Sequence, residues 1–121
     1  MSIITATRQI GSVTIVDITG NIVFGGDWAL LHGLIGRLLS NGYKRMVFNL
    51  SGVEYIDSSG LSYLVSALAS VRKADGELKL LKPKKRVLDT MRITKLDVIF
   101  DILDKEAAAL RSFGQSAATT A

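Results

Sequence analysis

The chain has 121 residues, of which 48% are apolar, so it is long enough for one domain with a hydrophobic core, and disorder is excluded for most of its length. Its net charge is +4, and the positive charge is unevenly distributed, because residues 72–95 contain nine Lys or Arg and only three Asp or Glu. This segment is either a solvated face or a surface for an acidic partner. The chain has no cysteine and one histidine, His32, which excludes disulfides and thiolate chemistry and argues against any metal or cofactor. Residues 1–11 lack a signal-peptide pattern, and no apolar run approaches the roughly 18 residues that span a bilayer. We therefore expect a cytoplasmic protein without membrane insertion.

Two strands joined by a tight turn open the chain. Residues 3–9 and 13–19 flank residues 10–12, Ile-Gly-Ser, a pattern typical of a β-hairpin. The Gly-Asn pair at residues 20–21 is expected to end the second strand, and residues 22–24 form a short apolar piece after it.

A helix and then a strand–turn–helix unit are predicted next. Asp27 is expected to cap a helix over residues 28–39, where apolar residues recur at helical spacing, and Ser-Asn-Gly at residues 40–42 ends it. The apolar run at residues 46–50 indicates a buried strand. Apolar positions within residues 61–74 then fall on one face of an amphipathic helix.

The last third of the chain is predicted to alternate between strands and helices. These elements are a strand at residues 77–81, a helix at 84–91, a short strand at 98–100 and a helix at 104–113. The small and polar segment 114–121 is expected to be a disordered tail, which leaves residues 1–113 as a single domain.

Strand–helix alternation from residue 45 onward implies right-handed crossovers and parallel strands, whereas the opening hairpin is antiparallel. We therefore predict an α/β fold, with a mixed sheet of four to five strands and about four helices packed mainly on one face. In this arrangement Leu64 and Leu68 should be buried against the strand at residues 47–50, and the basic residues 84–86 should be exposed.

The sequence Asp57-Ser58-Ser59-Gly60 joins the central strand to its helix and is the main candidate site. Asp57 or Ser58 can cap the first free amides of the helix, and Gly60 keeps the first turn slim. A purely structural role in capping explains these residues no worse than a functional role. The functional alternative is a phosphoacceptor. Phosphorylated Ser58 would carry a charge of roughly −1.5 to −2, which the helix dipole tolerates and Asp57 opposes. Such a change of surface charge suits a binding switch better than a catalyst.

Signatures of enzymes are absent from the sequence. It has no G-x-x-x-x-G-K-[ST] phosphate loop, no G-x-G-x-x-G and no G-x-S-x-G elbow. Asp57, Ser58 and His32 do not fit a catalytic triad, because an adjacent Asp and Ser cannot both take the required places around a histidine. We therefore do not expect an enzyme, and we interpret His32 as a surface residue of its helix.

Several stretches of the chain match one family pattern. The central match is Asn49-Leu50 followed by Ile56-Asp57-Ser58-Ser59-Gly60-Leu61. Further matches are Val16-x-x-x-Gly20-Asn21, Gly76-Glu77-Leu78 and Val87-x-x-x-Met91-x-x-Thr94-x-Leu96 with Phe100. Over residues 8–111 the chain resembles STAS domains, particularly bacterial anti-sigma factor antagonists. One departure is Gly20-Asn21-Ile22-Val23, which lacks the acidic residue that the family often carries after its second strand.

The resemblance implies a STAS-like single domain with a role in partner switching. An unphosphorylated antagonist of this family binds an anti-sigma factor that is also a serine kinase, and so frees the sigma factor. The kinase phosphorylates the serine after the motif aspartate, which maps onto Ser58, and a PP2C-type phosphatase restores the binding form. By the same mapping, the residues expected to bind the partner are Asp57, Ser58, Ser59, Gly60 and Ser62. We expect a monomer or weak dimer that does not bind nucleic acid directly.

Two other functions remain open at this point. STAS domains also serve as constitutive interaction subunits, in stressosomes or with transporters, and the serine would then only cap its helix. A small nucleotide-binding protein is the weakest alternative, because the chain has no phosphate-cradling loop.

Overall fold

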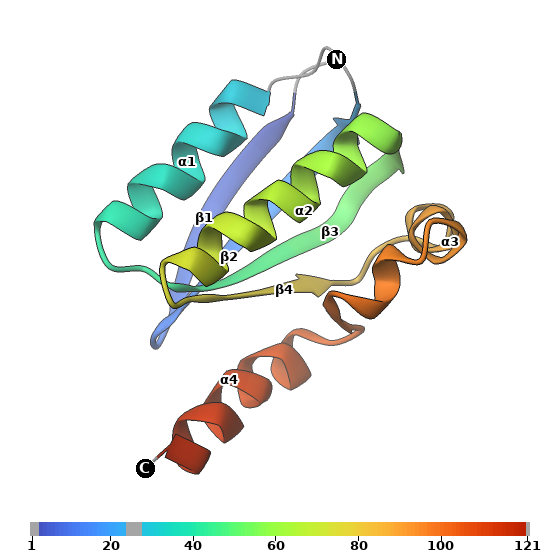
Figure 1. The fold of residues 1–121 in the computed structure, drawn as a ribbon. Helices are drawn as coiled ribbons and strands as arrows, with labels where there is room; N and C mark the ends of the chain where they lie inside the picture. The colour runs from blue at the N-terminus through green and yellow to red at the C-terminus, as the bar shows by residue number, and fades with distance from the viewer. Residues whose placement is uncertain (1–2, 24–27, 121) are drawn as a thin grey trace.

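A computed structural model of the chain describes residues 3–23 and 28–120 and contains one five-stranded sheet with helices around it (Figure 1). The strands are β1 (Ile4–Ile10), β2 (Val13–Ile22), β3 (Arg45–Ile56), β4 (Glu77–Leu81) and β5 (Asp101–Leu103). The helices are α1 (Trp28–Ser40), α2 (Ser58–Lys73), α3 (Lys85–Ile93), the short 3₁₀ helix η1 (Leu96–Val98) and α4 (Glu106–Thr120). The strands lie side by side in chain order; β1 is antiparallel to β2, and every later pair is parallel. The predicted mixed sheet is therefore confirmed.

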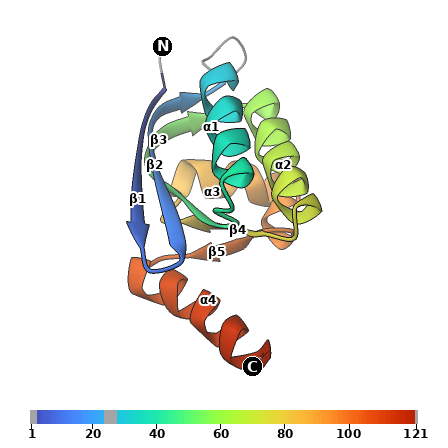
Figure 2. The same cartoon turned by 90° about the vertical axis from the view of Figure 1, so that its left-hand side faces the viewer.

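The main hydrophobic core lies between the sheet and three helices. Figure 2 shows α1 and α2 side by side over this face, and the buried residues Val87 and Met91 bring α3 to the same core. Leu64 and Leu68 of α2 are buried there together with Phe48 of β3, as the helical spacing predicted. Alternate residues of each strand thus face these helices, and the next residues point to the other face.

The fourth helix covers part of the opposite face of the sheet. Ala109 and Phe113 of α4 are buried in a second, smaller cluster. Its other buried members are Val13, Ile15, Val47 and Leu81, which come from three different strands. Lys79 of β4 is only 6% exposed; its Nζ lies 3.2 Å from the Asp101 carboxylate and 4.8 Å from the centroid of the Phe113 ring. Three of the four α-helices lie on one face of the sheet, as predicted. Helix α4 forms a second layer on the other face.

Two strands are longer than the sequence indicated. The second strand does not end at Gly20 but continues to Ile22, with an irregular register between these residues. Gly20 has a φ of 116°, which glycine adopts without strain, so it bends the strand instead of ending it. The central strand likewise continues beyond Leu50 to Ile56. Both extensions bring strand ends up to the start of α2.

The end of the chain also differs from the prediction. The last strand is β5 at residues 101–103, and not residues 98–100, because Val98 is 79% exposed and belongs to η1. The final helix continues through residues 114–120, for which we had expected a disordered tail. The domain boundary at residue 113 remains a prediction. The proposed cap Asp27 lies outside the described residues.

Candidate functional site

One residue, Asp57, makes the turn between β3 and α2. Its backbone is extended, with φ −100° and ψ −178°, and its Oδ1 accepts a hydrogen bond of 2.8 Å from the amide of Gly60. The carbonyl oxygen of Asp57 accepts a further bond of 2.9 Å from the amide of Leu61. Of the two capping residues that the sequence allowed, Asp57 and Ser58, the N-cap is therefore Asp57.

Gly60 lets the first turn of α2 approach the end of β2. A Cβ atom at this position would lie 2.0 Å from the carbonyl oxygen of Ile22 and 2.8 Å from Cγ1 of Ile56. The same Ile22 oxygen accepts a hydrogen bond of 3.3 Å from the amide of Asp57. The sequence predicted a slim first turn; the structure identifies the neighbour that requires it as the backbone of β2, and so explains why β2 must extend to Ile22.

The five residues expected to bind a partner lie together at the start of α2, but they differ in accessibility. Ser58 and Ser62 are exposed, and they share one face of the helix because they are four residues apart. Asp57 and Ser59 are partly exposed, whereas Gly60 is buried. A partner can therefore touch the side chains of Ser58 and Ser62 directly, and Gly60 contributes by holding the turn. That these residues bind a partner remains a prediction.

The N-terminal end of α3 lies against the strand that leads into this turn. Lys84, the N-cap of α3, forms an ion pair with Glu54 of β3. The guanidinium carbon of Arg86 lies 5.3 Å from the centroid of the Tyr55 ring, which is 40% exposed. Only two residues separate Tyr55 from Ser58, a chain distance of about 11 Å at most. The surface around Ser58 therefore includes α3, which the sequence alone did not reveal.

The basic residues 84–86 are exposed, as predicted, but each has a partner within the chain. Lys85, whose side chain is 89% exposed, forms an ion pair of 3.0 Å with Asp89 one turn later. The pairing of Lys84 with Glu54 further reduces the local excess of positive charge. Exposed pairs of this kind add little to stability, and they leave the surface less cationic than the residue count of the segment indicates.

A polar network on the opposite face of the sheet was also missed by the sequence analysis. Arg8 donates two hydrogen bonds to the Asp17 carboxylate, of 2.7 and 3.0 Å, and one of 2.8 Å to Glu106 of α4. Asn49 donates to Asp17 at 2.7 Å. The hydrogen bonds from Arg8, followed by the one from Asn49, hold the pKa of Asp17 below its usual value. Asn49, part of the family pattern, therefore joins β3 to β2 and does not face Ser58.

Within the described ranges, no group of three or more histidine or acidic side chains is placed to hold a metal ion. In the same part of the chain, no helix is both long and apolar enough to cross a bilayer.

The fold and the turn at Asp57 can now be compared with known proteins. The model of the STAS domain matches residues 5–109, which is most of the chain. The chain belongs to the STAS domain family. A Thermotoga neapolitana protein named as a candidate anti-sigma factor antagonist is 40% identical over 74 residues. The match covers 61% of this chain and 66% of that protein, just under two thirds of its length.

Solved structures agree with this family membership. The crystal structure of a candidate anti-sigma factor antagonist from Thermotoga maritima has a TM-score of 0.81 and 26% identity, covering 89% of this STAS chain and 92% of that one. The phosphorylated form of the Bacillus cell fate determinant SpoIIAA has a TM-score of 0.70 and 13% identity, over 91% and 99% of the two chains. At 13% identity the second comparison shows a shared fold alone.

Proposed function

We propose that this STAS domain is an anti-sigma factor antagonist controlled by phosphorylation of Ser58. In its unphosphorylated form it binds an anti-sigma factor that is also a serine kinase, and thereby releases the sigma factor. The names of its relatives support the antagonist role. The protein then acts in the cytoplasm as a binding module and not as an enzyme.

One observation carries the assignment of Ser58. Its side chain is exposed at the first position of α2, while Asp57 supplies the capping oxygen. Within the described residues the Ser58 hydroxyl makes no hydrogen bond. A kinase can therefore modify this hydroxyl without removing a bond on which the helix depends. A serine that served only as a cap would accept one of the first amides of the helix, and that bond is made by Asp57.

The chemistry of the switch follows from this position. Transfer of the γ-phosphoryl group of ATP breaks its bond to ADP and forms a bond to the Ser58 oxygen, whose proton passes to a base of the kinase. The phosphate adds roughly −1.5 to −2 charge. The α2 N-terminus tolerates this charge, because its free amides and dipole favour anions, so the fold survives. At the surface the new charge adds to that of Asp57 and opposes rebinding of the kinase. A PP2C-type phosphatase hydrolyses the ester and restores the binding form.

Phosphate mapping tests the proposal. The wild-type chain, Ser58→Ala and Ser62→Ala are incubated with ATP and the serine-kinase anti-sigma factor of the same organism, and the products are mapped by mass spectrometry. We expect one phosphate on Ser58 in the wild type and in Ser62→Ala, and none in Ser58→Ala. Ser62 is the matched control because it is an equally small, exposed serine on the same face of α2. Phosphate on Ser59 or Ser62, or on no residue, would contradict the assignment and favour a constitutive interaction subunit.

A further inference from the structure

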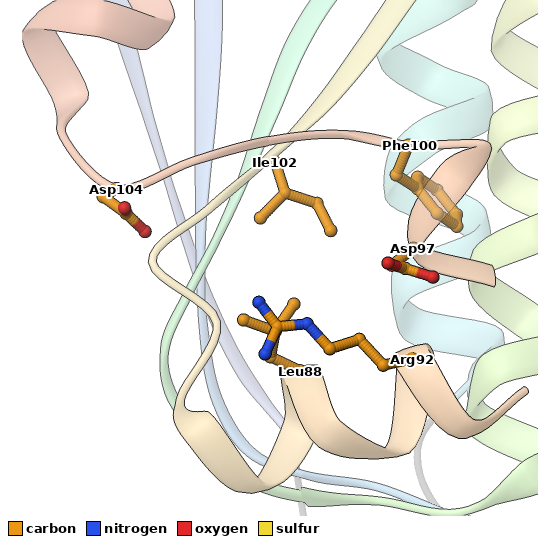
Figure 3. A pocket seen from close by; sticks show the side chains of 6 residues that line it. All are labelled: Leu88, Arg92, Asp97, Phe100, Ile102 and Asp104. Carbon is orange, nitrogen blue, oxygen red and sulfur yellow. The ribbon is translucent and has the colours of Figure 1, made fainter. Parts of the chain in front are cut away.

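A pocket of about 350 Å³ lies between α3, η1 and β5, away from the turn at Asp57. It is lined by Leu88, Arg92, Asp97, Phe100, Ile102 and Asp104. Figure 3 shows Leu88 and Arg92 of α3 facing Ile102 across the pocket, with Asp97 and Asp104 at its two sides. The pocket thus combines three apolar side chains with charged groups of both signs.

The three charged side chains of the pocket differ from charged residues at the start of α3 in their pairing. Within the described residues, the side chains of Arg92, Asp97 and Asp104 form no ion pair or hydrogen bond. This distinguishes them from the charged residues at the N-terminal end of α3, where Lys84 and Lys85 are each paired. Unpaired charges of both signs on one small surface can pair across an interface with a surface of the same composition.

Two exposed apolar side chains follow lining residues of the pocket in sequence. Ile93, which follows Arg92, is 82% exposed, and Val98, which follows Asp97, is 79% exposed. They are the two most exposed large apolar side chains of the described residues. Burying such exposed apolar side chains in an interface removes them from water, which favours association.

We propose that this surface, formed by the pocket with Ile93 and Val98, binds a second copy of this chain about a two-fold axis. A two-fold contact brings the same patch of both copies together, so the patch must be complementary to itself. The protruding side chains of one copy would fill the pocket of the other. Arg92 of each copy would face Asp97 and Asp104 of the other, which pairs charges that have no partner among the described residues of one copy.

The dimer would leave the turn at Ser58 free. The Arg72 guanidinium donates a hydrogen bond of 3.4 Å to the carbonyl oxygen of Ile99, which places η1 at the C-terminal end of α2. Ser58 is at the other end, about 21 Å away at roughly 1.5 Å per residue. The inference therefore does not rest on the proposed function, and either can fail without the other.

Sedimentation velocity of the purified full chain, from roughly 10 μM to 1 mM, tests the contact, because weak dimers become populated in this range. We expect the wild-type chain to pass from monomer to dimer, and Val98→Asp to raise the dissociation constant at least roughly tenfold. The control Ile4→Asp changes a 66% exposed apolar residue on β1, at the opposite edge of the sheet, and should dimerise like the wild type. A wild-type chain that stays monomeric throughout, or a Val98→Asp dimer as tight as the wild type, would overturn the proposal.

A charge exchange tests the two-fold geometry. Arg92→Glu alone and Asp97→Lys/Asp104→Lys alone should each dimerise more weakly, because each places like charges opposite one another. Mixed in equal amounts, the two variants should form a heterodimer of roughly wild-type affinity, because both sets of facing charges are again opposite in sign. Circular dichroism melting confirms that each variant is folded. A folded mixture no tighter than its separate components would overturn the two-fold contact.

Discussion

Asp57 and Ser58 are adjacent, yet the structure gives them different tasks. Asp57 turns its carboxylate back to the Gly60 amide and closes the first turn of α2, whereas Ser58 points its hydroxyl outward. The capping bond does not involve the proposed phosphoacceptor. Changes at Ser58 should therefore alter binding without altering the fold.

The variants Ser58→Ala and Ser58→Asp should separate binding from stability. Ser58→Ala removes the acceptor and should bind the kinase without being released from it. Ser58→Asp places a second negative charge beside Asp57, and a loss of only about 1.4 kcal/mol at the interface weakens binding tenfold. Both should melt within a few degrees of the wild type. Calorimetric titration with the kinase and thermal melting measure the two effects; equal binding by both variants would contradict the switch.

Gly60 and Gly36 are both helical glycines, but substitution by alanine should have opposite effects. At Gly60 the new Cβ meets the Ile22 carbonyl oxygen at 2.0 Å, so backbone must move, and we expect a loss of about 1–3 kcal/mol or more. At Gly36, in α1, nothing lies within 4 Å of the new Cβ, and the better helix propensity of alanine should add about 0.5–1 kcal/mol. Urea denaturation of both variants gives the comparison. A neutral Gly60→Ala would mean that β2 and α2 are not in contact there.

At the scale of elements, α4 is joined to the sheet by apolar burial and by two charged contacts. Phe113 is 1% exposed beneath the helix and lies against Lys79, while Glu106 at the other end accepts from Arg8. These contacts reach the edge strand β1 and the inner strand β4. The helix therefore connects strands that are distant from each other in sequence.

Phe113→Ala should lower the free energy of unfolding by about 3–5 kcal/mol, because it leaves a cavity beneath α4. Arg111→Ala, an exposed change in the same helix, should stay within about 0.5 kcal/mol. Chemical denaturation measures both. If the two variants lose equally little, α4 does not contribute to the stability of the fold.

The network around Asp17 predicts a pH dependence of stability. The pKa of Asp17 is lower in the folded chain than in the unfolded chain, so the folded state binds fewer protons between these two values. The contribution of Asp17 is fully present above its ordinary pKa of 3.8 and is lost as the pH falls through the folded value. Asp17→Asn should therefore be destabilised at pH 7, by a margin that shrinks at pH 3.

At the scale of the whole molecule, local patterns predicted most of the fold. Apolar spacing placed α1 and β4 to within one residue and α2 to within three, and the Asp-Ser-Ser-Gly sequence located the candidate turn. What they missed depends on contacts between distant segments. The Gly-Asn pair at residues 20–21 is typical of the end of a strand. Strand β2 nevertheless continues to Ile22, whose carbonyl group packs against Gly60.

The residues of the candidate site were predictable from the sequence, but their separate roles were not. Ser58 and Asp57 were found from the motif, but the division between cap and exposed hydroxyl required the structure. The approach of Lys84 to Glu54, 30 residues earlier, has no local signal beyond opposite charge. The pocket beside Val98 was missed because Val98 was assigned to a strand, whereas in the structure it protrudes from η1.

The order of the strands bears on how the chain is made. Each strand pairs with the strand that precedes it in sequence, so no later segment has to insert between two that have already paired. During synthesis on the ribosome, the hairpin of β1 and β2 can form first, and β3, β4 and β5 can join the growing edge as they emerge. Helix α4 leaves the ribosome after all five strands, and only then are Ile15 and Val47 covered on the second face. Until that moment the nascent chain exposes one apolar side of its sheet, which is the stage at which it most needs protection from aggregation.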